Sequence, residues 1–553
     1  MERNLPVVVQ GATEGWRAAR EWVAPGGGVN FDLLGELFGG AEVAVTDTAR
    51  HHQGCGPCQE MRLSQYLVWW REQQQRQQQE QQQRAAGKQQ GAPGEAASAA
   101  AAAAGGAAAA AAACQSGVSP QQWRQQQQQP TGYQQQQPLL YCKDWHLAAA
   151  FPSYQAYIPP PFFADDWLNE YFDATQGAVA QRGAQQQQQR QGEQAEGEPP
   201  PQQQRQEQQE QQQQQGSRVA ASDYRFVYMG PQGTCTPLHA DVLRSNSWSA
   251  NVVGRKRWRL LPPCHSHLLQ DRHGRGTAWD FCADDPEGLY PGLPEAWRRL
   301  VTVEQQPGEA IFVPSGWFHT VENLDDCVSI NHNWLNGHNV HWAWMLLRAE
   351  RAAAEAGIKD CRELSGPAEF ECLVQRNMRA NAGLDWAGLG ALLRCIADAS
   401  LHALAEAGRA LGTTAAAEQA PTAALVALLL TDPAAAPAAA AEPAAAAGPA
   451  AAEPEEPAAP GGVWYHAFRL LRAGLVLRDL LAEQRRIHAA CQQQQAAWLQ
   501  RQQRQRADAD GSAADAAQHA EQGAARQLAA EVEANSGCLA RIERRLQALG
   551  VAL

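Results

Sequence analysis

Lysine is scarce in this chain. It occurs at only four positions, Lys88, Lys143, Lys256 and Lys359, and arginine supplies the rest of the 45 basic residues. Acidic residues outnumber basic ones, and the formal net charge is −13. The chain therefore lacks the excess of positive charge with which proteins bind a phosphate backbone, and nucleic acid is not expected as its primary partner.

Long apolar runs are also missing. A membrane-spanning helix needs about 20 mostly apolar residues, and an export signal needs an apolar core near the N-terminus. The alanine tract at 97–113 is weakly hydrophobic and interrupted by glycine. The 13 cysteines are an odd number and mostly scattered, which favours a reducing compartment over a disulfide scaffold. We expect a protein of the cytoplasm, or of the cytoplasm and nucleus, without a membrane partner.

A small group of metal-ligand residue types lies near the N-terminus. His51, His52, Cys55 and Cys58 follow the spacing H-H-x-x-C-x-x-C. Cysteine and histidine are the usual zinc ligands, but no second CxxC or HxxxH pair completes a common zinc module. A surface loop is expected here, with a structural metal as the alternative.

Three low-complexity segments divide the chain. Residues 72–138 and 182–217 are rich in glutamine, with a glycine and alanine tract in the first, and 414–460 consist mainly of alanine and proline. They carry too few large apolar side chains to offset the entropy lost on folding, so we expect disordered or loosely helical insertions.

The remaining sequence forms the expected folded parts. These are 1–71 and 139–181 as the two N-terminal pieces, 218–340 as the catalytic barrel, 341–413 as a helical region and 461–553 as C-terminal helices. The C-terminal helices are expected either to pair with a second copy in a homodimer or to form a helical layer on the barrel.

Short apolar stretches separated by glycine and proline turns fill the region 218–340. The expected strands are 224–229, 234–241, 248–253, 257–261, 309–313, 317–322 and 327–333. Many short strands with tight turns favour a double-sheet antiparallel barrel. We therefore expect a mainly β fold with helical additions, namely a double-stranded β-helix of jelly-roll or cupin-like type with flanking N- and C-terminal helices.

His239-Ala-Asp241 places two metal-ligand side chains two positions apart. On a strand, alternate residues point to the same face, so both side chains would point the same way. His319 follows the turn Pro314-Ser-Gly316 later in the chain. Two imidazoles and one carboxylate make the facial triad that binds Fe(II) and leaves positions open for O2 and a 2-oxo acid.

The H-x-D pattern is weak by itself. A similar pair occurs at His519-Ala-Glu521, within an expected helix, where residues two apart do not share a face. Lys256 adds specificity to the first pattern, because a rare lysine between two arginines indicates a need for a compact point charge. A buried lysine can bind the far carboxylate of a 2-oxo acid. The alternative for Lys256 is an exposed basic turn.

Three segments of the chain resemble the JmjC oxygenases. They are 228–241, which contains Thr-Pro-Leu-His-Ala-Asp, 247–258, which contains Gly-Arg-Lys-Arg-Trp, and 307–321, which contains Pro-Ser-Gly-Trp-Phe-His. The likeness extends over most of the expected folded sequence from Pro6 to Asn339. It is strongest to the JmjC protein lysyl hydroxylases that act on eukaryotic release factor 1.

The resemblance implies a JmjC barrel that uses Fe(II), O2 and 2-oxoglutarate as cosubstrate, and it assigns roles to individual residues. It implies that His239, Asp241 and His319 bind the iron and form the catalytic centre. It further implies that Lys256, Thr236, Ser249 and Asn331 contact 2-oxoglutarate, and that Asn333 lies close by.

The activity that this resemblance implies is C-hydroxylation of a lysyl residue in a translation termination factor, with the release factor as protein partner. Demethylation of N-methyl-lysine by the same iron chemistry is an alternative, although the sequence shows no paired CxxC reader module and no basic chromatin tail. A non-catalytic cupin-like interaction scaffold is the second alternative, and oxidation of a small molecule is the third.

Overall fold

The computed structural model describes residues 3–50, 56–89, 137–176, 222–283, 285, 287–410, 462–506 and 512–553. His51, His52 and Cys55 of the candidate zinc group lie outside these residues, and Cys58 is exposed. Most of the three low-complexity segments also lie outside them.

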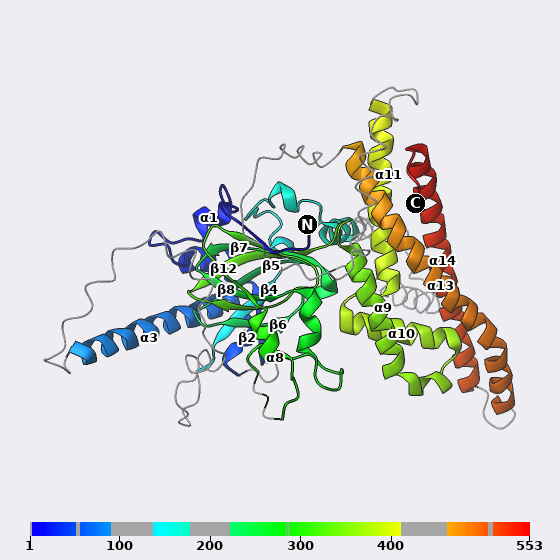
Figure 1. Cartoon of the computed structure of the whole chain (residues 1–553), viewed down its shortest axis with the longest axis horizontal. Coiled ribbons are helices and arrows are strands. Elements are labelled where there is room, and N and C mark those ends of the chain that lie inside the picture. Colours follow the sequence, from blue (N-terminus) through cyan, green and yellow to red (C-terminus); the bar gives the residue numbers. More distant parts are fainter. Residues whose placement is uncertain are drawn as a thin grey trace, which may run out of the picture.

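Two antiparallel sheets form the centre of the protein (Figure 1). The larger has the strand order β1-β10-β7-β12-β5-β4-β2-β3, and the smaller has the order β6-β11-β8-β9. The strands are β1 (Val7–Val9), β2 (Glu42–Asp47), β3 (Cys58–Arg62), β4 (Leu140–Trp145), β5 (Arg225–Gly230), β6 (Cys235–His239), β7 (Asn246–Val253), β8 (Lys256–Leu261), β9 (Val301–Gln305), β10 (Ala310–Val313), β11 (Phe318–Asn323) and β12 (Cys327–Trp334).

One buried cluster joins the two sheets. It combines Trp258 and Val321 of the smaller sheet with Ile311 and Val313 of the larger one. Because these apolar side chains meet between the sheets, the two sheets form a closed sandwich with a narrow interior. The expected jelly-roll core is confirmed.

The N-terminal helices pack on the larger sheet. They are α1 (Arg17–Glu21), α2 (Phe31–Phe38) and α3 (Leu63–Gln89), and α3 projects well beyond the sheets (Figure 1). Ala18, Phe38 and Trp70 from these helices share one buried cluster with Trp248 and Ile330 of the larger sheet. This cluster holds the larger sheet in place, and the inner face of that sheet carries part of the candidate site.

A second helical group lies beside the sandwich (Figure 1). It consists of α9 (Val340–Gly357), α10 (Pro367–Ala382), α11 (Trp386–Ala410), α13 (Val463–Arg506) and α14 (Ser512–Ala548). Its core also takes in Trp167 and Leu335 from the region of the sandwich. Within α11, the stretch Trp386–Arg409 is long and apolar enough to cross a membrane by length and composition alone, and half of its most apolar 18 residues are buried in the protein. The helices form the expected layer, while their pairing in a homodimer stays a prediction.

Short elements connect these parts. They are α5 (Leu147–Ala150), α8 (Leu293–Arg298) and the 3-10 helices η1 (Thr48–Arg50), η3 (Pro161–Phe163), η4 (Val242–Arg244), η5 (Pro263–Leu269) and η6 (Lys359–Glu363).

Glu521 has a structural role in the helical group. Its carboxylate is buried and accepts hydrogen bonds from the backbone N–H groups of Ala368 and Glu369, both at 2.9 Å. These are unpaired donors of the first turn of α10, so Glu521 of α14 caps α10 from a distant part of the chain. His519 is exposed on the same helix, as expected for a chance occurrence of the H-x-E pattern.

The structure differs from the expected elements at sheet edges and at one helix. β3 and β9 were not expected, because both pair with only one neighbour and show little burial, which removes the strict apolar alternation. The helix α3 extends past residue 71, the expected end of the first folded piece, to Gln89, since glutamine, glutamate and arginine all favour helix.

Gly254 shapes the β7–β8 hairpin that carries Ser249 and Lys256. Its φ is +77°, and a Cβ there would lie 2.2 Å from the carbonyl oxygen of Asp326. Gly254→Ala is expected to lower the free energy of unfolding by more than the roughly 1–3 kcal/mol that a left-handed conformation alone costs. Gly274→Ala is the matched control, since its φ is +65° and no atom lies within 4 Å of the added Cβ. Chemical denaturation would contradict this prediction if both variants lost equal stability.

Candidate metal centre

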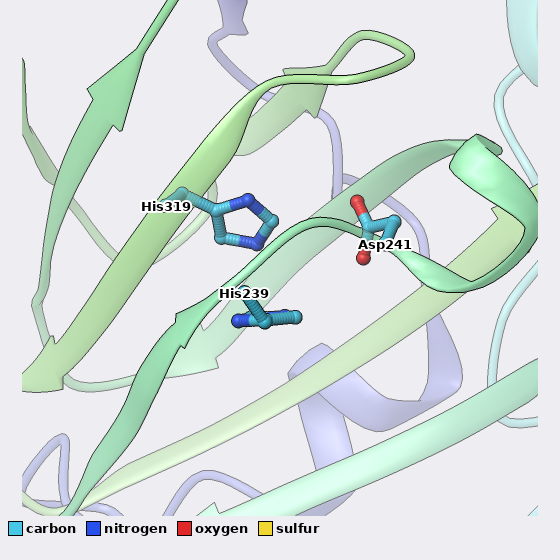
Figure 2. A group of neighbouring side chains, drawn as sticks. All are labelled: His239, Asp241 and His319. Carbon is cyan, nitrogen blue, oxygen red and sulfur yellow. The ribbon is translucent and has the colours of Figure 1, made fainter. Parts of the chain in front are cut away.

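Two imidazoles face each other from neighbouring strands of the smaller sheet. His239 ends β6, and His319 lies near the start of β11. The two residues are direct partners in the antiparallel pairing of β6 and β11. Their ring centroids are 4.3 Å apart, and both rings point into the space where the carboxylate of Asp241 also lies (Figure 2). Sheet register thus brings together two residues that are far apart in sequence.

Asp241 lies beyond the end of β6, so the expectation that it shares a strand with His239 was wrong. The pairing with β11 stops at His239, and the chain continues directly into η4. The backbone of Asp241 nevertheless remains extended, with φ −58° and ψ 149°. The candidate ligand atoms of Asp241, His239 and His319 all lie within 4.8 Å of one another.

A sharp turn follows Asp241 and fixes its direction. Leu243 and Arg244 both have positive φ, 55° and 47°, a conformation that non-glycine residues rarely adopt. The side chain of Leu243 is 2% exposed and belongs to the core of the C-terminal helical group. Ser247 Oγ donates a hydrogen bond of 2.7 Å to Asp241 Oδ2. The other carboxylate oxygen remains available to a metal.

The two histidines are held in the same way. Nδ1 of His239 lies 2.8 Å from the carbonyl oxygen of Pro237, and Nδ1 of His319 lies 3.1 Å from that of Trp317. A carbonyl oxygen can only accept, so each Nδ1 carries the proton and each Nε2 keeps its lone pair. Burial and the neighbouring His319 lower the pKa of His239 to about 4, and the neutral imidazole is the form that binds metals.

Lys256 is a buried cation in the same cavity. Its side chain is 1% exposed, and Nζ donates a hydrogen bond of 2.6 Å to Ser329 Oγ. No acidic side chain in the described part of the chain forms an ion pair with it. Burial lowers its pKa to about 8. Because an unpaired buried ammonium is costly, this position fits a site that receives the carboxylate of a ligand.

Thr236, Ser249, Asn331 and Asn333 line the cavity together with the three candidate metal ligands and Lys256. Ser249 and Asn331 are direct partners across β7 and β12. Ser249 Oγ and Asn331 Oδ1 are buried and have no hydrogen-bond partner among the described residues. Buried polar atoms are rarely left unpaired, so these two fit contacts to a bound polar molecule. The structure thus places every sequence-predicted site residue in one cavity.

The sequence did not single out Tyr141 and Tyr228, which line the same cavity. Aromatic residues on strands more often serve core packing, so neither residue carried a separate signal. A Cβ at Gly230 would lie 2.6 Å from the ring of Tyr141, which explains the glycine at the end of β5. Ser247 and Ser329 were missed for a similar reason, since only their contacts with Asp241 and Lys256 reveal a role.

The match to a family model covers most of this architecture. Residues 1–339 match the model described as the cupin-like domain. The chain belongs to this family. The cupin-like match includes both sheets and all three candidate metal ligands.

Several relatives place this cupin-like chain among the JmjC proteins, as the resemblance predicted. The chain is 33% identical to arginine-specific demethylase JMJ20 of Arabidopsis thaliana, over 70% of this chain and 63% of that protein. It is 31% identical to the 2-oxoglutarate and iron-dependent oxygenase JMJD4 of Gallus gallus, over 70% and 67% of the two chains. It is 30% identical to JMJD4 of Homo sapiens, over 73% of each chain. The chain therefore spans less than two thirds of the length of JMJ20.

Removal of a candidate ligand is expected to abolish metal binding. Mn²⁺ titration of the purified cupin-like protein, followed by calorimetry, should show a single site in the wild type. Asp241→Ala and His319→Ala should each raise the dissociation constant by more than the roughly 10–100-fold that loss of a supporting residue costs. Ser247→Ala, which removes only the hydrogen bond to Asp241, should stay within that range. An unchanged Mn²⁺ affinity in either ligand variant would contradict the site.

Lys256→Met is expected to stabilise the protein in the absence of ligands. The pKa of Lys256 is 10.5 in the unfolded chain and about 8 in the folded protein. Lys256 therefore binds its proton less tightly in the folded state than in the unfolded state. The resulting loss in the free energy of unfolding is fully present below pH 8 and disappears between pH 8 and 10.5. The shift corresponds to about 3 kcal/mol, from which the lost hydrogen bond to Ser329 removes about 1 kcal/mol.

The measurement is urea denaturation of wild type and Lys256→Met at pH 7 and at pH 10. The variant should be the more stable protein at pH 7, and its advantage should shrink at pH 10. A variant that is less stable at pH 7 would show that the ammonium is well compensated by its surroundings.

Proposed function

We propose that the protein is an Fe(II)- and 2-oxoglutarate-dependent oxygenase in which His239, Asp241 and His319 hold the iron. The observation that carries this proposal is the shared cavity of a three-ligand centre and a buried, unpaired lysine. Three protein ligands leave coordination positions open, unlike a structural zinc site with four. A dicarboxylic 2-oxo acid can chelate the metal at one end and neutralise Lys256 at the other. The names of the JMJD4 relatives support the same pair of cofactors.

In this proposal, the residues of the cavity have different roles. Lys256 binds the far carboxylate of 2-oxoglutarate, and Thr236, Ser249 and Asn331 supply further polar contacts. Ser247 orients the carboxylate of Asp241. When bound, iron with 2-oxoglutarate and O2 supplies the oxidising power to insert one oxygen atom into a substrate C–H bond, while the cosubstrate becomes succinate and CO2.

The proposed reaction is C-hydroxylation of a lysyl residue in a protein substrate, and the proposed substrate is eukaryotic release factor 1. The sequence resemblance to that group of lysyl hydroxylases and the kinship with JMJD4 support this choice. It is consistent with a site of action in the cytoplasm, or in the cytoplasm and nucleus. Pairing of the C-terminal helices of two copies is proposed as the route to a homodimer.

Demethylation of a protein side chain is the second candidate. It is favoured by the identity to JMJ20, which is named an arginine-specific demethylase. Both reactions begin with insertion of oxygen into a C–H bond, but hydroxylation retains the oxygen in the protein, whereas demethylation loses the methyl carbon as formaldehyde. A non-catalytic scaffold is disfavoured by the unpaired Lys256, which would destabilise the protein without serving a ligand.

Mass spectrometry separates these candidates. Release factor incubated with the protein, Fe(II), 2-oxoglutarate and O2 is expected to gain one oxygen atom on a lysyl residue, in step with succinate formation. His239→Ala and Asp241→Ala should abolish the gain, because each removes an iron ligand, and circular dichroism should show an intact fold. Formaldehyde release from methylated protein, without a retained oxygen, would favour demethylation. Full activity in either variant would contradict the assigned site.

A further inference from the structure

The strand β4 carries a bulge next to the candidate metal centre. Cys142 pairs with Met229 and Trp145 pairs with Val227, so β4 has one residue more than β5 in this interval. Lys143 and Asp144 therefore both lie opposite Tyr228. Asp144 has φ 57°, in the left-handed region that non-glycine residues seldom adopt. Such bulges redirect side chains, and here the redirected side chain is an exposed carboxylate.

Tyr228 connects this carboxylate to the cavity. Its hydroxyl donates a hydrogen bond of 2.5 Å to Asp144 Oδ1. Its ring lines the cavity that contains the three candidate metal ligands, and its centroid lies 6.0 Å from Lys256 Nζ. The ring therefore extends from the buried lysine to the exposed Asp144 at its outer end.

A second aromatic ring packs against that of Tyr228. Phe226 stacks on Tyr228 with centroids 6.1 Å apart and an angle of 8° between the planes. The ring centroid of His146 lies 5.2 Å from that of Phe226. Phe226 and Tyr228 are both partly exposed. Parallel rings of this kind can hold the methylene groups of a long side chain and attract its cationic end.

The charges around the cavity favour a carboxylate at its mouth. The interior already holds the Lys256 ammonium, and a bound metal ion would add to the positive charge. Asp241 is the only carboxylate among the described residues that line the cavity, and it faces the metal position. A cationic substrate side chain therefore needs an anion from outside the lining, and Asp144 is an exposed carboxylate that is hydrogen-bonded to Tyr228 of the lining. Lys143, its neighbour, lines an adjacent cavity that shares Thr236 with this one.

We propose that Asp144, together with the rings of Tyr228 and Phe226, forms the subsite for the cationic end of the substrate side chain, an ammonium or a guanidinium. The carboxylate pairs with the cation, and the two rings contact its alkyl chain. This subsite rests on the proposed function, because it presents to the iron a carbon of the side chain that it holds. Asp144 is thus a specificity-determining residue, and it leaves the iron and the cosubstrate untouched.

The test compares two small probes that differ mainly in charge. Nα-acetyl-lysinamide and Nα-acetyl-norleucinamide are titrated into the full chain loaded with Mn²⁺ and 2-oxoglutarate, and the Mn²⁺-induced broadening of their methylene proton signals is measured by NMR. The wild type is expected to bind the lysine amide at least tenfold more tightly. Equal broadening of the two probes by the wild type would overturn the proposal.

The variant Asp144→Asn removes the negative charge of this side chain without changing its shape. Asparagine has the same shape, can still accept the hydrogen bond of Tyr228, and tolerates the left-handed backbone. The preference for the lysine amide should disappear in this variant, whereas a merely structural role of Asp144 would preserve it. Asp32→Asn is the matched control, since it removes an exposed carboxylate from α2 and should leave the preference unchanged. Asp144→Gly removes the strain of the left-handed backbone at this position and should also abolish the preference for the lysine amide.

Failure of the proposed subsite can be distinguished from failure of the proposed function. If wild-type protein hydroxylates its substrate and Asp144→Asn leaves the KM for that substrate unchanged, the subsite is wrong and the function stands. If no protein substrate is modified but the preference for the lysine amide depends on Asp144, the subsite stands and the proposed hydroxylation is wrong. If the subsite and the proposed function are both correct, Asp144→Asn should raise the KM for the protein substrate at least tenfold and leave the KM for 2-oxoglutarate unchanged.

Discussion

The pairing of β6 with β11 is the constraint on which the candidate centre depends. It sets His239 directly opposite His319, at the point where the ladder of hydrogen bonds ends. A shift of one residue in this register would turn one imidazole to the opposite face of the sheet. The end of the ladder also frees the chain after His239 to turn, so that Asp241 can approach from outside the strand. The register of β6 and β11 and the end of β6 together bring three candidate metal ligands to one place.

The larger sheet completes the centre with polar groups that a sandwich interior seldom contains. Ser249, Asn331 and Ser329 lie on its central strands β7 and β12, and Ser329 contacts Lys256 of the smaller sheet. Apolar side chains close the interior on the other sides, which lowers the local polarity and strengthens any contact between the lysine and an anion. The same burial makes the free protein carry an unpaired charge, so the site is organised at a cost to stability.

The barrel and the three candidate ligands could be predicted from the sequence because both depend on local sequence patterns. Strands such as β7 and β12 alternate or run apolar between tight turns, and His239, Asp241 and His319 follow a recognisable spacing. The edge strands β3 and β9 show no such pattern, since most of their side chains are exposed and need not be apolar. The end of β6 at His239 and the bulge at Lys143 and Asp144 depend on which residue pairs with which. That choice is made by distant strands, so neither feature could be predicted from its own segment.

The left-handed turn behind Asp241 links the metal centre to the C-terminal helices. Leu243 is buried in the core of that helical group, two residues after a candidate ligand. The packing of the C-terminal helices around Leu243 therefore helps to hold the chain that carries the Asp241 carboxylate. Whatever binds at the triad also adds its binding free energy to the stability of these helices. Conversely, we expect damage to the helical group to weaken metal binding at the triad, although none of its described helices contributes a candidate ligand.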